Sequence, residues 1–266
     1  SLKDFGAVGD AIVDDTVAVQ AFIAYIESNT TTGRRGYIPA GDYKLTSPIN
    51  ITKIYSYLYG EGKFMSRLLA DGVTGSVFLF APALTQVKPQ WRDFSIIDDT
   101  LATTGSAIDL WLTDANSVVY DFEFTNMYLK SKGSAFAAKH LFSGKMENVT
   151  AHSSTGHSFL AHCGPAVTWI NTYAATCAAT KAGYRLSGQI TMVGPNGLNS
   201  GGWWGVFGSD TTGTEGFQSD FPFTSYPSID IKGINVEAFT SEGILIDQQY
   251  TFAEISGTID RSSLTS

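Results

Sequence analysis

The chain has 266 residues, of which 13% are aromatic and only 16% are charged. It is long enough to bury a substantial core, and its composition argues against disorder and is typical of an all-β protein. The formal net charge is -8 and the basic residues are scattered along the chain, which argues against a nucleic-acid partner.

The sequence offers no pattern for a metal, a cofactor or a membrane span. The two cysteines, Cys163 and Cys177, match no zinc motif with the four scattered histidines, so we expect buried free thiols, no metal and no cofactor. No apolar run approaches the roughly 18 residues that a membrane-spanning helix requires. We therefore expect no membrane insertion.

An acidic loop opens the chain, in the stretch "DFGAVGDAIVDDTVAVQAFI" from Asp4 to Ile23. Apolar residues then recur at helical spacing, which predicts an amphipathic helix over residues 15–28. We expect Asp14 and Asp15 to cap this helix at its positive end rather than to take part in catalysis. Two strands follow in "RGYIPAGDYKLTSPINI", with a tight turn at residues 39–42.

These segments, followed by "YLYGEG", resemble the N-terminal signature of the pectate-lyase-like right-handed β-helix proteins, especially bacteriophage tailspikes and capsule depolymerases. The resemblance covers about residues 2–62 and implies a helix that caps the N-terminal end of a parallel β-helix. Ala11 stands where this family usually has Gly. The resemblance also implies a trimer that acts on a polysaccharide.

A repeat in the rest of the chain predicts the same architecture independently. Asn126, Asn148 and Asn171 are 22 and 23 residues apart, Gly194 follows after 23 more, and Asn235 after 41. Strand-length apolar runs at this period are typical of the coils of a parallel β-helix. The predicted fold is therefore an all-β, right-handed, single-stranded parallel β-helix (solenoid) with an N-terminal capping α-helix. We expect residues 1–62 to form the cap and residues 63–266 the coils, with an insertion at about 201–227.

The repeat also assigns residues to stacked columns. The asparagines, Asn235 included, are expected to form a turn ladder because Asn tolerates left-handed backbone. Two apolar columns are expected in the core: one with Phe94, Met127, Val149 and Val236, the other with Ile108, Phe136, Phe159, Leu186 and Ile246.

The insertion is the richest place for chemistry, because sugar binding uses flat aromatic faces and glycoside hydrolysis uses two carboxylates. The candidate catalytic carboxylates are Asp210, Glu215 and Asp220 in the insertion, with Glu237 and Asp247 on the following coil, where the preceding coils carry Asn196 and Val206. The candidate substrate-binding residues are Trp203, Trp204, Phe217 and Tyr226, with Tyr184 and Arg185 one coil below. Packing of these aromatic residues on their own coil or on a neighbouring subunit is an alternative that the sequence leaves open.

Other polar residues have plainer interpretations. Asp121 and Glu123 alternate with Phe122 and Phe124, so they point outward and are expected to be solvated. His140, His152, His157 and His162 lie on adjacent coils at different offsets and are expected to be surface residues.

The expected function is that of a homotrimeric phage tailspike on the virion tail, in contact with other tail proteins, that binds and hydrolyses a bacterial surface polysaccharide. Two alternatives remain open. One is a secreted polysaccharide lyase of the same fold, with Arg185, Lys181 or a Tyr as the base. The other is a non-catalytic polysaccharide-binding tail protein. The stretch "EISGTIDRSSLTS" ends within repeat-like sequence, which leaves open whether the chain is a truncated piece.

Overall fold

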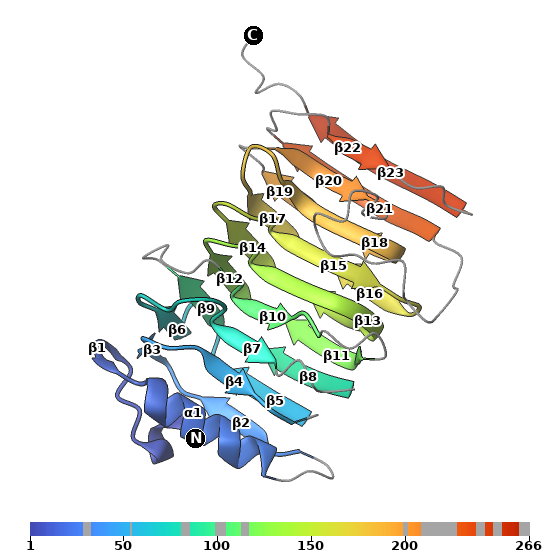
Figure 1. The fold of residues 1–266 in the computed structure, drawn as a ribbon. Helices are drawn as coiled ribbons and strands as arrows, with labels where there is room; N and C mark the ends of the chain where they lie inside the picture. Colours follow the sequence, from blue (N-terminus) through green and yellow to red (C-terminus); the bar gives the residue numbers. More distant parts are fainter. Residues whose placement is uncertain are drawn as a thin grey trace.

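Parallel pairing between strands that lie one turn of the chain apart organises the molecule (Figure 1). The computed structural model describes residues 1–28, 33–53, 55–80, 86–98, 105–112, 117–198, 202–208, 228–237, 243–246 and 252–260. These residues are nearly all β: beside 23 strands they contain the α-helix α1 (Thr16–Glu27) and the short 3-10 helix η1 (Leu2–Phe5).

The strands fall into three ladders, each formed by strands that pair in succession along the stack. Ladder A contains β1 (Asp10–Asp14), β3 (Gly41–Leu45), β6 (Ser66–Ala70), β9 (Ser95–Asp98), β12 (Tyr128–Ser131), β14 (Thr150–Ser153), β17 (Tyr173–Thr176), β19 (Asn196–Leu198) and the second parts of β21 (Ser228–Glu237) and β23 (Phe252–Asp260). Ladder B contains β2 (Arg35–Ile38), β5 (Tyr55–Gly60), β8 (Gln86–Arg92), β11 (Val118–Thr125), β16 (Val167–Ile170), the second parts of β13 (Phe136–Glu147) and β18 (Ala182–Val193), and the first parts of β21 and β23. Ladder C contains β4 (Ile49–Ile51), β7 (Phe78–Phe80), β10 (Ile108–Leu110), β15 (Phe159–Cys163), β20 (Trp203–Phe207), β22 (Ile244–Ile246) and the first parts of β13 and β18.

From β8 to β18, the corner from ladder B to ladder A contains one left-handed residue, as the asparagine spacing predicts. Asn126, Asn148 and Asn171 have φ of 52°, 52° and 47°, and Asp93 precedes them with φ 62°. Asn126 Nδ2 donates to Asp93 Oδ1 at 2.7 Å, which links two successive corners. The strands beyond this corner pair at the predicted period, since Tyr128 is opposite Thr150 and Thr150 is opposite Tyr173.

From Gly194 onward the predicted alignment is wrong by two residues. Asn196 lies opposite Asn235, so the residue that follows Gly194 at the corner is Gly233, with φ 69°, and not Asn235. Glu237 likewise pairs with Leu198 and not with Asn196. Val236 is therefore outside the column of Phe94, Met127 and Val149.

The second core column differs in the same way. Ile108, Phe136 and Phe159 pair in succession, but the next residue is Tyr184 rather than Leu186. Leu186 pairs with Phe207, which pairs with Ile246, so these residues lie two positions further along their strands. The Tyr184 ring stacks on Phe159 with centroids 5.1 Å apart, and both side chains are completely buried.

α1 lies at the N-terminal end of the stack (Figure 1), one residue shorter at each end than predicted. Its apolar face, with Val19, Phe22, Ile23 and Ile26, is buried in the core. Gly36 on β2 permits this close approach, because a Cβ there would lie 2.6 Å from the Phe22 ring and still closer to Ile26.

Both acidic residues before α1 were predicted to cap the helix, but only Asp14 bonds to it, so the prediction is wrong for Asp15. Asp14 Oδ1 accepts from the Thr16 N–H at 3.0 Å and therefore caps the helix. Asp15 is buried and accepts from the backbone of Val8 and Gly9 instead, which fixes the preceding loop. In that loop Ala11 has φ 65°, a left-handed conformation that glycine adopts more readily than alanine.

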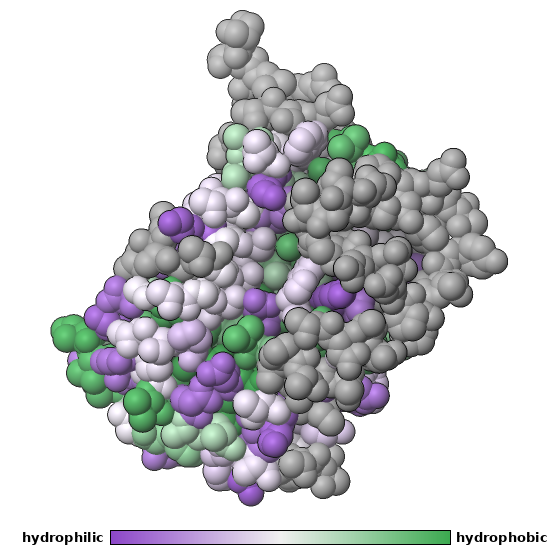
Figure 2. Space-filling model, in the orientation of Figure 1, coloured by the Kyte–Doolittle hydropathy of each residue, from purple (hydrophilic) through white to green (hydrophobic). Residues whose placement is uncertain are grey.

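Apolar side chains are exposed near the N-terminal end of the stack, where Figure 2 shows hydrophobic residues gathered on the surface. Ile12 on β1 and Val17 on α1 are 78% and 81% exposed.

Cys163 and Cys177 are buried and free, as predicted. Within the described residues, no helix has the length and apolarity needed to cross a membrane.

Candidate functional site

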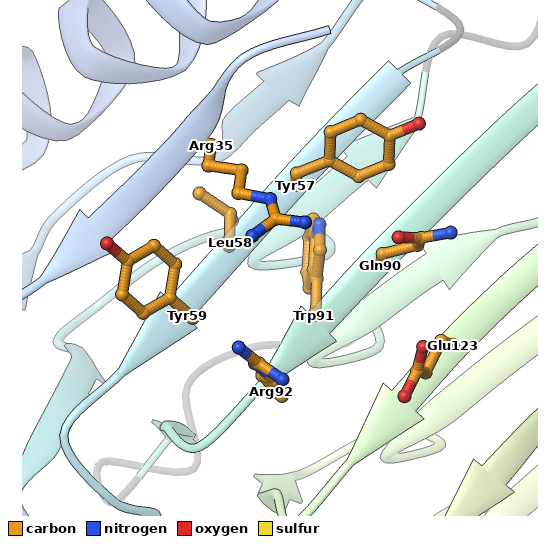
Figure 3. Close-up of a pocket in the computed structure, with 8 residues that line it drawn as sticks. All are labelled: Arg35, Tyr57, Leu58, Tyr59, Gln90, Trp91, Arg92 and Glu123. Carbon is orange, nitrogen blue, oxygen red and sulfur yellow. The ribbon is translucent and has the colours of Figure 1, made fainter. Parts of the chain in front are cut away.

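A hollow of about 150 Å³ lies on the outer side of ladder B, over β2, β5, β8 and β11 (Figure 3). Its lining residues are Arg35, Tyr57, Leu58, Tyr59, Gln90, Trp91, Arg92 and Glu123. Leu58 and Trp91 are almost completely buried, so they form an apolar floor, and the other six residues project from the strands around it.

Alternation along the strands produces this arrangement. In "YSYLYG" of β5, the inward residues Ser56 and Leu58 are buried, whereas Tyr55, Tyr57 and Tyr59 are only half-buried on the outside. Pairing then brings side chains from successive coils into line: Arg35 is opposite Tyr57, Tyr57 is opposite Gln90, and Gln90 is opposite Glu123. Because paired strands lie about 4.8 Å apart, these four side chains form a line along the stack beside the hollow, and we call the hollow together with this line the groove.

The tyrosines on one side of the groove are held in place by their neighbours. The Tyr37 ring stacks on Tyr59, with centroids 5.2 Å apart and ring planes at 29°. The Tyr37 hydroxyl donates to Glu61, and this hydrogen bond raises the pKa of Tyr37. The Arg92 guanidinium lies 6.0 Å from the centre of the Tyr59 ring. These contacts restrict the aromatic rings before any ligand arrives.

Lysines flank the groove where β8, β11 and β13 run side by side. Lys88 Nζ lies 3.6 Å from the centre of the Tyr120 ring and 3.2 Å from Asp121 Oδ2. Lys145 Nζ lies 3.4 Å from a Glu123 oxygen and 2.9 Å from Glu147. The outward direction predicted for Asp121 and Glu123 is confirmed, and both carboxylates are paired with lysines.

The groove has the chemistry of a sugar-binding surface. Flat, amphipathic rings and planar guanidinium groups suit the apolar faces and the hydroxyls of pyranose rings. Of the described residues that line the hollow, Glu123 is the sole carboxylic acid. We therefore interpret the hollow as a place for binding rather than as the two-carboxylate centre of a hydrolase.

Two of the residues predicted to bind substrate lie in the core. Tyr184 and Trp204 have no exposed surface, and their ring centroids are 5.0 Å apart. The Tyr184 hydroxyl donates to the Thr172 carbonyl at 2.8 Å, which satisfies its polar atom inside the protein. Buried rings cannot stack on a sugar, so we drop both residues from the candidate binding surface.

The other predicted residues have various positions. Trp203 is partly exposed at the start of β20, where it pairs with Ala182 rather than with Tyr184 or Arg185. Arg185 is 5% exposed, and its Nη1 donates to the Gly208 carbonyl at 2.9 Å. The backbone of Glu237 belongs to ladder A. The remaining candidates lie outside the described residues: Asp210, Glu215, Phe217, Asp220, Tyr226 and Asp247.

The structure brings together two histidines that sequence offsets appeared to separate. Lys139 and His140 both face His162 across the ladder because β13 carries one extra residue there, and His140 adopts φ 60°. The His140 and His162 rings are 6.0 Å apart, and His162 Nδ1 lies 2.6 Å from Ser187 Oγ. Burial lowers the pKa of His162 to about 4, so this imidazole is neutral at pH 7.

The groove itself was missed at the sequence level, although a signal for it exists. Three tyrosines alternate in "YSYLYG", and a fourth, Tyr37, lies one coil earlier. These tyrosines occupy the outward-facing positions of their strands, so packing in the core does not explain why they recur. Within the described residues, no three His, Cys, Asp or Glu side chains group as metal ligands would.

Comparisons with known proteins place the chain in a family. Mannuronan C5-epimerases AlgE5 and AlgE2 of Azotobacter vinelandii are each 46% identical to it over 48 residues, which are 17% of this chain and 4% of the relative. Its fold is also similar to that of the bacteriophage phi29 gene product 12 N-terminal fragment, with a TM-score of 0.48, 13% identity and coverage of 92% of this chain and 57% of the other. ORF18 of Geobacillus virus E2 gives a TM-score of 0.46 with 16% identity, over 96% of this chain and 61% of the other.

The family comparison covers most of the chain. Residues 1–194 match the model of the family described as "Rhamnogalacturonase A/epimerase, pectate lyase-like". This range contains α1, most of the three ladders and every residue of the groove. The chain therefore belongs to the rhamnogalacturonase A/epimerase, pectate lyase-like family.

Proposed function

We propose that this protein binds and depolymerises a bacterial surface polysaccharide as part of a bacteriophage tailspike. The observation that carries the proposal is the groove on ladder B, in which restrained tyrosine rings and arginine side chains line an apolar floor over four successive coils. A surface of this kind suits an extended sugar polymer that lies along the stack. Membership of a pectate lyase-like family supports a polysaccharide as the ligand.

We also propose how the ladders, the N-terminal helix and the subunits are arranged. The three ladders are the three sides of a right-handed parallel β-helix, with residues 1–62 as its N-terminal cap, α1 as the capping helix, and residues 63–266 as coils. The protein acts as a homotrimer on the virion tail, in contact with other tail proteins. Support comes from the resemblance of residues 2–62 to tailspike sequences.

The proposed chemistry is hydrolysis by two carboxylates, one as acid and one as base or nucleophile. The pair is drawn from Asp210, Glu215, Asp220, Glu237 and Asp247, with Trp203, Arg185, Phe217 and Tyr226 as substrate-binding residues. The acidic and aromatic composition of residues 201–227 supports this assignment.

A second candidate, proton abstraction from a uronic acid residue, is favoured by the cluster on ladder C. There a neutral His162 lies on the strand next to the one that carries Arg185, since Leu160 is opposite Arg185 and His162 is opposite Ser187. A neutral imidazole can accept the proton next to a carboxylate, the first step of both lyase and epimerase reactions, but with a pKa of about 4 His162 would be a weak base. The curated relatives that share a 48-residue segment are named as epimerases.

One experiment separates these chemistries. The protein is incubated in deuterated water with purified capsular and O-antigen polysaccharides, and reducing ends, ultraviolet absorbance and deuterium in the polymer are followed together. We expect reducing ends without absorbance, which hydrolysis produces. Absorbance indicates a lyase, deuterium without cleavage indicates an epimerase, and the absence of both binding and reaction across the panel contradicts the proposal.

Variants test the groove separately from the chemistry. We expect Tyr59→Ala to weaken polymer binding because its ring forms one side of the hollow. Phe64→Ala is the matched control, since this ring is 64% exposed outside the hollow. Equal losses from both substitutions contradict a role of the groove in binding.

A further inference from the structure

We propose that the outer face of the N-terminal cap is a docking surface for a cationic amphipathic segment of another protein chain. This surface, the cap patch, combines exposed aliphatic side chains with two carboxylates: Val8, Ile12, Val13, Val17, Asp10 and Asp14. None of these residues lines the hollow on ladder B, so the cap patch and the groove are separate surfaces. The inference rests on the proposed contact with other tail proteins and deepens it by naming the surface and the chemistry of the partner.

Aliphatic side chains of the cap patch face the solvent, and hydrophobic residues are visible at this end of the stack in Figure 2. Val8 and Val13 are 43% and 45% exposed, beside Ile12 at 78% and Val17 at 81%. The terminal unit of a solenoid needs a polar outer face to remain in solution by itself. Exposed aliphatic residues gathered there therefore indicate a surface that a partner covers.

Hydrogen bonds join the parts of the cap patch into one ordered surface. Asp15 accepts from the Val8 N–H at 2.6 Å, which holds the loop against the start of α1. The Asp15 N–H donates to the Lys44 carbonyl at 2.8 Å, and the Thr46 N–H donates to Thr16 Oγ1 at 2.8 Å, so the first turn of α1 is held against β3. A surface that is ordered before binding loses less conformational entropy when a partner docks.

The partner docks through side chains and not by adding a strand to β1. Asp10 Oδ1 accepts from the backbone N–H groups of Ile12 and Val13, both at 2.9 Å. These two donors are satisfied locally, so β1 does not offer them to an incoming strand.

Two carboxylates bracket the aliphatic residues in the sequence "DAIVD" of β1. Asp10 accepts from backbone N–H groups, and Asp14 accepts from Thr16 and from the Thr46 hydroxyl. Neither carboxylate forms an ion pair with another residue in the part of the chain that the structure describes. Aspartates of this kind are ionised at pH 7, so the aliphatic centre of the cap patch has negative charge on both sides.

The lysines near the cap patch do not cancel this charge. Lys3 acts on Asp10 through space, but its ammonium group donates to the Val8 carbonyl. Lys44 forms an ion pair with Asp71, with Nζ 2.7 Å from the carboxylate oxygen. The cap patch therefore keeps an excess of negative charge beside its apolar surface.

This combination of apolar surface and negative charge favours one kind of occupant. A second copy of the chain would bring the same carboxylates against each other, which opposes association. The negative surface of a membrane with anionic lipids would repel them in the same way. A segment with aliphatic residues at its centre and Lys or Arg on either side covers the apolar surface and also pairs with the carboxylates.

The test uses a fluorescently labelled synthetic helical peptide of Leu and Lys as the probe, and its binding to the full chain is followed by anisotropy. Two comparison peptides have Glu in place of Lys, or Ser in place of Leu. We expect the Leu–Lys peptide to bind about tenfold or more tightly than either comparison peptide, because each of these lacks one of the two features that the cap patch recognises.

Variants of the cap patch make the test specific. We expect Val17→Ser and Asp10→Asn each to weaken binding of the Leu–Lys peptide about fivefold or more. Asn keeps a side-chain oxygen for the two backbone N–H groups, so Asp10→Asn removes the charge alone. Val193→Ser and Asp121→Asn are the matched controls, since Val193 is 46% exposed and both residues lie on strands of ladder B. Thermal unfolding of each variant checks that the fold is intact.

The inference is overturned if the Leu–Lys peptide does not bind, if a comparison peptide binds as tightly, or if the control variants weaken binding as much as Val17→Ser. Self-association of the wild type that Ile12→Ser abolishes assigns the cap patch to a second copy and also overturns it. The same holds for binding to vesicles of phosphatidylcholine and phosphatidylglycerol that Val17→Ser abolishes. Polymer binding that Tyr59→Ala weakens while the peptide does not bind rejects the cap patch alone and sustains the role of the groove.

Discussion

The Asp15 carboxylate accepts a 2.6 Å hydrogen bond from the backbone N–H of Val8, and its second oxygen accepts from Gly9 at 3.0 Å. Because Asp15 is 1% exposed, its replacement by Ala leaves two backbone donors without their charged acceptor. We expect Asp15→Ala to lower the free energy of unfolding by about 2–3 kcal/mol, measured by denaturant titration. Asp10→Ala is the control, since Asp10 bonds to exposed backbone only. A loss no larger than that of the control contradicts this role of Asp15.

Gly36 allows α1 to approach β2 closely. A methyl group at this position meets Ile26 and Phe22 directly, so we expect Gly36→Ala to destabilise the protein by about 1–3 kcal/mol. The double variant Gly36→Ala with Ile26→Val is expected to recover part of the lost stability, because the shorter valine side chain leaves room for the methyl group added at position 36. Thermal unfolding of the two variants checks this, and additive losses refute the steric explanation.

Asn148 tests the left-handed corner. With φ 52° it adopts a conformation that costs an alanine about 1–2 kcal/mol but costs glycine little. Asn148→Ala is therefore expected to be less stable than Asn148→Gly, and the chain itself uses glycine at the equivalent position Gly194. If the two variants are equally stable, the left-handed backbone conformation does not explain why this corner has Asn rather than Ala.

His162 makes stability depend on pH. In the unfolded chain its pKa returns to about 6.5, whereas burial keeps the native value at about 4. Above pH 6.5 both states are neutral and His162 has no effect. Between pH 6.5 and 4 the unfolded chain alone takes up the proton, so stability falls by about 3 kcal/mol at most, and below pH 4 the effect is complete.

The variant His162→Gln checks this dependence. Its free energy of unfolding, measured from pH 7 to pH 4.5, is expected to fall less steeply than that of the wild type. Some slope remains because burial also lowers the pKa of His140 and of His152. A variant as steep as the wild type shows that His162 is not the titrating group.

The sequence predicts the repeat, the N-terminal helix and the corner residues, because each depends on local rules: period, helix capping and the tolerance of Asn for positive φ. The sequence does not predict which residues of neighbouring coils pair, because two alignments of the strands can follow the same alternation of inward and outward residues. A shift of two residues preserves the alternation of inward and outward side chains, so Leu186 and Tyr184 are equally acceptable core residues by pattern alone. Only the pairing of Phe159 with Tyr184 decides between them.

The groove was missed for a related reason. Its residues belong to four strands between positions 35 and 123, and only the three-dimensional stack brings Arg35, Gln90 and Glu123 into one line. The histidine pair depends on one extra residue in β13, which a regular repeat does not foresee. A periodic pattern thus predicts the scaffold better than the sites at which the period is broken.

The short corner between ladders B and A has a consequence for how such proteins can be engineered. At Asp93, Asn126, Asn148, Asn171 and Gly194, only two residues separate one strand from the next. At the same edge, however, residues 61–65 connect β5 to β6, and β6 still pairs with β3 below and β9 above. An engineered specificity loop at this edge therefore has a precedent between β5 and β6, where a longer connection leaves the register intact.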